Sequence, residues 1–217
     1  MLTDKQAVLF DLDGTLADSM WVWTDIDRTF FASRQIPVPD SLQKDIEGMS
    51  FTETAQYFID TFYLPETLEE LKQLWNRMAM ERYATEVKLK PGALEYLHHL
   101  KRKGIRTGIA TSNSRLLLDV FLHRNHLKGL FDALTTSDEV KQGKPSPDVY
   151  LRAARKMQIK PDRCLVFEDL PNGILAGKNA GMEVCAVEDS YSADLKTVKQ
   201  QMADYYIKDF LHMEQES

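Results

Sequence analysis

Residues 7–15 read AVLFDLDGT, an apolar run that leads directly into two aspartates, a glycine and a threonine. An unbroken apolar run of this length indicates a strand that is buried on both faces, as the strands of parallel sheets are. Gly14 permits a sharp turn after this strand. Asp11 and Asp13 therefore lie at the carboxyl end of the first strand, where open parallel sheets bind their ligands.

Downstream of this stretch, short apolar strands alternate with amphipathic helices. The predicted strands cover residues 105–110, 131–135, 165–167 and 184–187. The predicted helices cover residues 93–103, 115–125, 149–157 and 174–180. Such an alternation indicates right-handed crossovers and a mostly parallel sheet with helices on both faces. We therefore expect an α/β fold with a Rossmann-like parallel sheet at its core.

One long segment, residues 18–88, interrupts the alternation because it has helical patterns but no convincing strand. Between Leu64 and Met78 apolar residues recur every three or four positions, as they do on one face of a helix. The sequences SFTE at 50–53 and TLEE at 67–70 are capping boxes, which begin helices. The segment is too long for a simple crossover, so we expect it to form a small α-helical cap domain after the first strand.

This insertion predicts how the chain is divided. The Rossmann-like core combines residues 1–17 with residues 89–217, and the cap covers residues 18–88. Four aromatic residues are expected to form the core of the cap: Trp21, Trp23, Phe30 and Phe31.

The composition is that of an ordinary soluble globular protein, with 43% hydrophobic and 28% charged residues in a chain of 217. The net charge of −6 argues against a large nucleic-acid-binding surface. Cys164 and Cys185 both lie in apolar runs and are expected to be buried, reduced thiols. The sequence has neither a signal-peptide pattern nor an apolar stretch long enough to span a bilayer. We expect a cytoplasmic protein, without membrane association, that is a monomer.

Three further groups of polar residues follow later strands. The first is TSN at 111–113, whose hydroxyl and backbone donors at the start of a helix suit a phosphate. The second is GKPSPD at 143–148, where a rigid setting between glycine and proline suggests a directed role for Lys144. The third is the acidic pair Glu168 and Asp169, which ends the fourth strand. Acids at two strand ends can hold a hard dication such as Mg²⁺, while Thr111 and Lys144 can hold a phosphoryl group.

Taken together, these residues resemble the haloacid dehalogenase superfamily, in its phosphatase branch with a helical cap after the first strand. The resemblance covers nearly the whole chain. It is carried by D-x-D-x-T at residues 11–15, by Thr111, by Lys144 in a G-K-P sequence, and by Glu168 with Asp169.

The resemblance implies a role for each motif residue. Asp11 would attack phosphorus and form an aspartyl-phosphate, and Asp13 would act as general acid and then as general base. Lys144 would neutralise charge and orient Asp11. Mg²⁺ would be bound by Asp11, by the main-chain carbonyl of Asp13 and by Asp169, with Glu168 supporting or joining the site.

The resemblance also implies which residues bind the substrate. Thr111 and the amide of Ser112 would bind phosphoryl oxygens, and Thr15 and Asn113 are candidates beside them. Gly48 and Met49 lie between two predicted cap helices, where similar proteins have a loop that reaches over the active site. The substrate is expected to be a small phosphorylated metabolite. Nucleoside monophosphates and small alcohol phosphates stay open, and a sugar phosphate is favoured.

Several rival functions use related machinery. The β-phosphoglucomutase-like enzymes of the same branch usually carry a histidine where the cap begins and a lysine in the cap. Here residues 20–23 read MWVW and residues 76–82 read NRMAMER, so hydrolysis is favoured and a phosphomutase is the alternative. Dehalogenation and phosphonate hydrolysis fit the motif residues less well. A phospho-accepting or binding protein without catalysis is the most remote interpretation.

Overall fold

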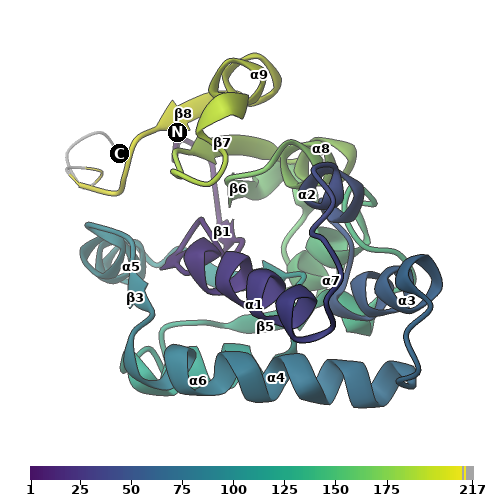
Figure 1. The fold of residues 1–217 in the computed structure, drawn as a ribbon. Coiled ribbons are helices and arrows are strands. Elements are labelled where there is room, and N and C mark those ends of the chain that lie inside the picture. The colour runs from purple at the N-terminus through teal and green to yellow at the C-terminus, as the bar shows by residue number, and fades with distance from the viewer. Residues whose placement is uncertain (212, 214–217) are drawn as a thin grey trace.

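The computed structural model describes residues 1–211 and 213. Its main sheet has six strands in the order β5-β4-β1-β6-β7-β8 (Figure 1). These strands are β1 (Ala7–Phe10), β4 (Arg106–Thr111), β5 (Ala133–Thr136), β6 (Cys164–Glu168), β7 (Glu183–Val187) and β8 (Tyr205–Ile207). Every neighbouring pair is parallel. The expected α/β fold with a Rossmann-like sheet is thus confirmed, and β8 is an edge strand that the sequence did not reveal.

The order of the strands places β1 at the point where the chain changes direction across the sheet. The chain runs from β1 to β4 and β5 on one side, then returns to β6, β7 and β8 on the other. Phe10 is paired with Ile109 of β4 and with Phe167 of β6, so the three strands end side by side. Such a switch point is where open α/β sheets bind ligands.

The two faces of β1 belong to different hydrophobic clusters. Val8 and Phe10 pack with helices α5 and α6, whereas Ala7 and Leu9 pack with α7 and α8. The core helices are α5 (Ala93–Arg102), α6 (Arg115–Arg124), α7 (Asp148–Lys156), α8 (Pro171–Asn179) and α9 (Lys196–Met202), with short 3₁₀ turns at Ser137–Glu139, Pro161–Arg163 and Ala193–Leu195. Burial on both sides explains why the first strand is apolar throughout.

Between two very short strands, β2 (Ala17–Asp18) and β3 (Lys88–Leu89), the chain forms four helices. These helices are α1 (Met20–Ser33), α2 (Leu42–Ile46), α3 (Phe51–Phe62) and α4 (Leu68–Thr85). The two short strands pair antiparallel and bring the ends of the segment together. We propose that residues 18–88 are the cap domain and that residues 1–17 and 89–217 are the core, of which 212 and 214–217 lie outside the described residues.

The starts of α3 and α4 have the capping geometry that the sequence indicates. Ser50 accepts a hydrogen bond from the backbone of Glu53 and Thr67 accepts one from the backbone of Glu70, and both boxes are reciprocal. The buried residues of α4 are Leu71, Trp75, Ala79 and Tyr83. Leu64 is also buried, but it precedes α4, so the apolar stripe predicted from 64 to 78 is displaced toward the C-terminus.

The aromatic core of these helices differs in part from the expectation. Phe30 and Phe31 are completely buried and pack against Phe58 at ring-centre distances of 5.7 and 5.5 Å. Trp21, however, is 37% exposed and its indole N–H donates to the carbonyl of Asp18. The prediction that Trp21 belongs to the core was therefore wrong, because it lies on the solvent side of α1.

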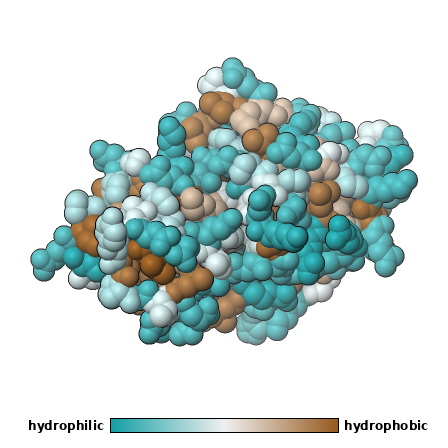
Figure 2. All heavy atoms as spheres, turned by 90° about the vertical axis from the view of Figure 1, so that its right-hand side faces the viewer, coloured by the Kyte–Doolittle hydropathy of each residue, from teal (hydrophilic) through white to brown (hydrophobic). Residues whose placement is uncertain are grey.

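The surface in Figure 2 is mainly hydrophilic, and hydrophobic residues appear there in small separate groups. Cys164 and Cys185 are buried free thiols, as expected. Within residues 1–211 and 213, no helix has both the length and the apolar character that crossing a bilayer requires.

Candidate active site

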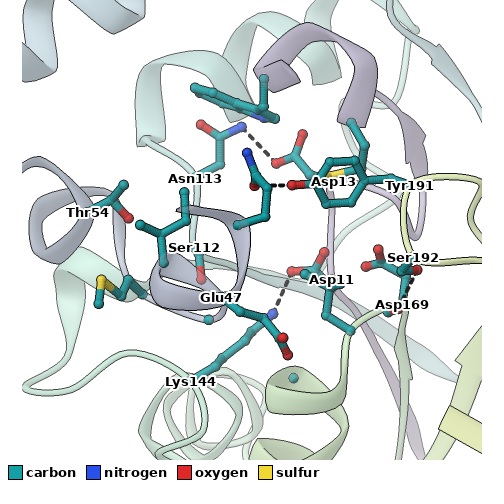
Figure 3. Close-up of a pocket in the computed structure, with 18 of the residues that line it drawn as sticks. Asp11, Asp13, Glu47, Thr54, Ser112, Asn113, Lys144, Asp169, Tyr191 and Ser192 are labelled. Carbon is teal, nitrogen blue, oxygen red and sulfur yellow. Dashed lines mark hydrogen bonds and ion pairs between the residues drawn. The ribbon is translucent and has the colours of Figure 1, made fainter. Parts of the chain in front are cut away.

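The carboxyl ends of β1, β4 and β6 carry the polar residues that the sequence singled out. Asp11 follows β1, Thr111 is the last residue of β4, and Glu168 is the last residue of β6. The backbone N–H of Asp11 donates to the carbonyl of Phe167 at 3.0 Å, which continues the parallel pairing beyond β1. All three residues line a single cavity of about 610 Å³ (Figure 3). This volume lies within the range of small-molecule sites.

Lys144 is the central cation of the site. Its Nζ lies 2.6 Å from Asp11 Oδ1 and 2.5 Å from Glu168 Oε1, and the residue is only 6% exposed. Figure 3 shows its side chain pointing toward Asp11 from the loop before α7. Buried ammonium groups need carboxylate partners because desolvation otherwise disfavours the charge. The directed role that the G-K-P sequence suggested is therefore matched by a buried ion pair.

Glu168 is held by four donors. Its Oε1 accepts from Lys144 and, at 2.9 Å, from the hydroxyl of Tyr150, whereas its Oε2 accepts from the backbone N–H groups of Asp169 and Leu170. Both oxygens are thus already used by the protein. Glu168 therefore holds the ammonium of Lys144 in place. With both oxygens occupied, it is less free than Asp11 or Asp169 to bind a metal.

The charges of the site do not balance by themselves. Burial raises the pKa of Asp11 to about 8, and Glu168 adds to the rise while Lys144 opposes it. Burial, together with Glu168 and Asp11, also raises the pKa of Asp169 well above its ordinary value. Burial alone lowers the pKa of Lys144, but Asp11 and Glu168 raise it above its ordinary value overall. Asp11 and Glu168 share the ammonium of Lys144, and Asp169 is buried beside them without an ion pair to any described residue, so the site favours a further cation.

The arrangement of these acids fits a hard dication. Asp11, Glu168 and Asp169 each offer a carboxylate oxygen, and these oxygens all lie within 4.8 Å of one another. Asp169 Oδ1 accepts from Thr15 at 3.1 Å, but its Oδ2 is buried without a protein partner. A Cβ on Gly14 would lie 2.2 Å from that Oδ2, so only glycine leaves it room. An unpaired buried carboxylate oxygen beside Asp11 is the kind of ligand that Mg²⁺ takes.

Asp13 lies beside Asp11 but has a separate set of partners. Ser19 Oγ donates to its Oδ1 at 2.6 Å and Asn113 Nδ2 donates to its Oδ2 at 2.8 Å. The hydroxyl of Tyr83, from α4, also donates to Oδ1. Figure 3 shows the carboxylate of Asp13 directed toward Asn113, whereas Asp11 faces Lys144. The two aspartates of the D-x-D sequence therefore have different surroundings, as different chemical roles require.

The residues predicted to bind the phosphoryl group are only partly brought together. Thr111, Ser112 and Asn113 line the cavity. Asn113 also uses its amide on Asp13, as described above. Thr15 differs from the expectation, because it is completely buried, is not among the residues that line the cavity, and directs its hydroxyl to Asp169. Thr15 is therefore better described as a residue that orients Asp169.

The loop between α2 and α3 is hydrogen-bonded to the core beside the cavity. Glu47 accepts from the backbone N–H of Asn172 at 2.9 Å, and the side chain of Asn172 donates to the carbonyl of Glu47 at 2.9 Å. The backbone N–H of Phe51 donates to the carbonyl of Ser112 at 3.0 Å. Gly48 and Met49 both line the cavity. The loop thus joins the proposed cap to Ser112 and Asn172 of the core, beside the cavity.

Replacing Gly48 by alanine is expected to lower kcat/KM about tenfold by moving this loop. Gly48 has φ +81°, and a Cβ there would lie 2.6 Å from the carbonyl oxygen of Lys144. Positive φ strains any residue with a Cβ by roughly 1–2 kcal/mol, and this clash adds to the strain. The matched control is Gly104→Ala, since Gly104 has φ +71° but nothing within 4 Å of the added Cβ. Equal kinetic losses in both variants would contradict the role given to the loop.

The rest of the cavity wall comes mostly from the cap helices and is apolar and acidic. Its apolar side chains include Trp23, Ile26, Ile46, Phe51, Phe58 and Trp75. Its acids, apart from those of the motifs, are Asp27, Asp40, Glu47 and Asp194. Among the described residues of the wall, Lys44 is the one basic residue besides Lys144.

Several residues of the site could not be identified in the sequence. Tyr83 lies on the buried stripe of α4 and resembles an ordinary core residue in the sequence, and Tyr150 has the same character in α7. Ser19 resembles a helix cap, yet it makes no side-chain capping bond. Asn172 lies only three residues after Asp169, at the same edge of the sheet, and this position was a weak indication that it belongs to the site.

The comparisons with known proteins agree with this geometry. The family model described as haloacid dehalogenase-like hydrolase matches residues 8–187. The chain is 30% identical over 178 residues to a phosphorylated carbohydrates phosphatase of Thermotoga maritima, and the match covers 82% of each chain. It is 34% identical over 183 residues to hexitol phosphatase A of Escherichia coli, with 82% of this chain and 81% of the relative covered.

A solved structure shows the same fold. The CbbY protein of Rhodobacter sphaeroides, in complex with phosphate, superposes with a TM-score of 0.84 at 24% identity, and the match covers 96% of each chain. The sheet order, the matched family model and the two curated relatives lead to one conclusion. The chain belongs to the haloacid dehalogenase-like hydrolase family, as an enzyme of its phosphatase branch.

Proposed function

We propose that this enzyme is a Mg²⁺-dependent phosphatase that hydrolyses a small phosphorylated metabolite through an aspartyl-phosphate on Asp11. The observation that carries this proposal is the buried ion pair between Lys144 and Asp11, 2.6 Å apart, on the wall of a cavity large enough for such a substrate. The ammonium orients a carboxylate oxygen toward the space where a phosphoryl group binds. Asp13 is close by but separately held, so it is available for proton transfer.

The proposed reaction has two displacements at phosphorus. In the first, a carboxylate oxygen of Asp11 forms a bond to phosphorus as the bond to the leaving oxygen breaks, and Asp13 gives its proton to that oxygen. In the second, Asp13 takes a proton from water as the water oxygen attacks phosphorus, and the bond to Asp11 breaks. Inorganic phosphate and the free alcohol are the products, and Asp11 and Asp13 return to their starting states.

Charge stabilisation is shared between the protein and the metal. Lys144, Thr111 and the backbone N–H of Ser112 are proposed to bind the phosphoryl oxygens. Mg²⁺, when bound, would neutralise the phosphate so that an anionic nucleophile can approach it. Asp11, the carbonyl of Asp13 and Asp169 are the proposed ligands, with Glu168 in the supporting role that its four donors indicate.

Replacing Asp169 by asparagine is expected to weaken Mg²⁺ binding by more than about tenfold, because one anionic ligand is lost. Asn can still accept the hydrogen bond from Thr15, so the fold should be retained. Calorimetric titration of the apo-protein with Mg²⁺ and with Mn²⁺ measures this without reference to activity. Asp204→Asn is the control, since Asp204 pairs with Lys178 at the surface. Unchanged affinity in Asp169→Asn would refute the proposed ligand set.

The cavity wall favours a substrate with one phosphate on an uncharged leaving group, such as a sugar phosphate. Beyond the motif residues the wall is aromatic and acidic, and among the described residues that line it Lys44 is the one further base that could attract a second anion. The names of the two curated relatives, which refer to phosphorylated carbohydrates and hexitols, also support this class. A cytoplasmic location and a monomeric state belong to the same proposal.

The charge of the wall predicts a preference between matched substrates. Fructose 6-phosphate should be hydrolysed with a kcat/KM at least about tenfold higher than fructose 1,6-bisphosphate, because like charges brought together in a binding site are costly. Asp27→Asn should reduce the ratio of the two kcat/KM values, because it removes one of the negative charges of the wall that repel the second phosphate. A preference for the bisphosphate would remove this argument and favour the phosphomutase alternative.

The function itself is tested by phosphate release from a panel of phosphorylated metabolites, in Mg²⁺ and in EDTA. The proposal expects release that depends on the metal and is strongest for sugar monophosphates. No release from any compound would exclude the phosphatase proposal. The same reactions, analysed for isomerised sugar phosphates, would then report a phosphomutase.

A further inference from the structure

The carboxylate of Asp13 is held by donors from three separate parts of the chain. Ser19 precedes α1, Asn113 follows β4, and Tyr83 comes from the last third of α4. Ser19 and Tyr83 both donate to Oδ1, and Asn113 donates to Oδ2. Two of these residues, Ser19 and Tyr83, are completely buried. The direction of this carboxylate is therefore fixed by the protein in detail.

The hydroxyl of Tyr83 can have only one orientation in this network. Trp23 Nε1 donates to its oxygen at 3.1 Å, and Asn113 Nδ2 donates to the same oxygen at 3.0 Å. With both accepting positions used, the single phenolic proton is directed to Asp13. The hydroxyl of Tyr83 therefore acts as a donor to Asp13 and as an acceptor toward Trp23 and Asn113.

Tyr83 differs from the rest of the buried face of α4 by its hydrogen bonds. The other buried residues of α4, namely Leu71, Trp75 and Ala79, contribute no hydrogen bond to the site. Tyr96 shows that this fold tolerates a buried phenol without a partner, because its hydroxyl has no hydrogen bond and the residue is completely buried. The hydroxyl of Tyr83, by contrast, donates a hydrogen bond to the carboxylate of Asp13 in the core, which a phenylalanine could not do.

We propose that Tyr83 is a positioning residue that the cap supplies to the acid–base group of the core. Through its hydrogen bond, α4 holds Asp13 in the orientation from which the proton is transferred. Asp13 then has this orientation only when α4 of the cap is correctly placed against the core. This inference rests on the phosphatase function proposed above, in which Asp13 protonates the leaving oxygen.

The test compares two substrates whose leaving groups differ in how much they need a proton from Asp13. A sugar alkoxide is a poor leaving group and needs protonation as the bond to phosphorus breaks, whereas p-nitrophenolate leaves with little help. The parameter kcat/KM reports formation of the phosphoenzyme, the step in which the leaving group departs. Tyr83→Phe should therefore lower kcat/KM about 10- to 100-fold for the best sugar phosphate of the panel, as expected for the loss of a hydrogen bond to a charged group. For p-nitrophenyl phosphate the loss should be less than about threefold.

Two further variants complete the experiment. Tyr96→Phe removes a buried hydroxyl that has no partner, and it should change neither substrate's kcat/KM. Ser19→Ala removes another donor to Asp13 without removing a helix cap, and it should repeat the selective loss seen in Tyr83→Phe. In an Asp13→Asn background, Tyr83→Phe should have little additional effect on the sugar phosphate, because residues that act through one group are not additive.

The outcomes separate this inference from the proposed function. A selective loss for the sugar phosphate supports the positioning role. An equal loss for both substrates would mean that Tyr83 is only structural, and no loss would mean that its hydrogen bond is dispensable; either result overturns the inference. If Asp13→Asn itself retains full activity on the sugar phosphate, the proposed mechanism fails first, whatever Tyr83→Phe does.

Discussion

Replacement of Asp11 by alanine is expected to abolish phosphate release, with a loss in kcat of more than about 10³-fold. Asp11 is the proposed nucleophile, and no neighbouring carboxylate can take its place. Glu168 is held by four donors, and Asp13 is directed toward Asn113 and Tyr83. The measurement is release of inorganic phosphate from the best substrate of the panel, in saturating Mg²⁺.

The fold should survive this substitution, which makes the kinetic result interpretable. Lys144 keeps its contact with Glu168 at 2.5 Å when Asp11 is removed, so its ammonium is not left unpaired. Burial raises the pKa of Asp11 to about 8, which means that the protein gains little stability from this carboxylate in its ionised form. Thermal unfolding of the variant in EDTA should therefore match or exceed that of the wild type.

The covalent intermediate gives a second measurement on the same variant. Wild-type enzyme quenched in acid during turnover should carry one phosphoryl group, located by mass spectrometry on the peptide that contains Asp11. Asp11→Ala should carry none. Phosphate release with no trace of the phosphoenzyme in the wild type, or measurable turnover by the variant, would show that water attacks the substrate directly.

The sequence predicted the sheet because its signals are local. The run at residues 7–10 is apolar at every position, and the structure buries all four residues between two layers of helices. The edge strand β8 has no such local signal and was missed. It has only three residues, and Tyr205 is exposed, so no buried apolar run marks it in the sequence. Strands β2 and β3, with two residues each, are too short to leave any periodic pattern.

The sequence predicted those residues of the candidate site that lie at the ends of strands. Asp11, Thr111, Glu168 and Asp169 lie where parallel strands end, and topology brings such positions together without knowledge of any side-chain contact. The partners of these residues were different. Tyr83 and Tyr150 act on Asp13 and Glu168 from buried helix faces, where a tyrosine looks like any other core residue. Only the packing of α4 and α7 in the folded chain shows where their hydroxyls point.

Asp13→Asn is expected to reduce turnover of a sugar phosphate by roughly 10²–10⁴-fold, because asparagine cannot exchange the proton. The substitution keeps the shape of the side chain. Its amide oxygen, in the place of Oδ1, can still accept from Ser19 and Tyr83, although its NH₂ group then faces the amide of Asn113, a donor left without an acceptor. A modest loss of stability should accompany the kinetic loss, on the order of 1–3 kcal/mol.

The result for p-nitrophenyl phosphate separates the two roles of Asp13. As general acid it matters little for this leaving group, so kcat/KM should fall far less than it does for the sugar phosphate. As general base it is needed by water in the second step whatever the leaving group was, so kcat should fall for both substrates, and the phosphoenzyme should accumulate in the variant. Mg²⁺ affinity should stay close to that of the wild type, because the ligand proposed at this position is the main-chain carbonyl. If the phosphoenzyme did not accumulate while kcat fell, the base would have to be another group, and the donors gathered around Asp13 would serve its acid role alone.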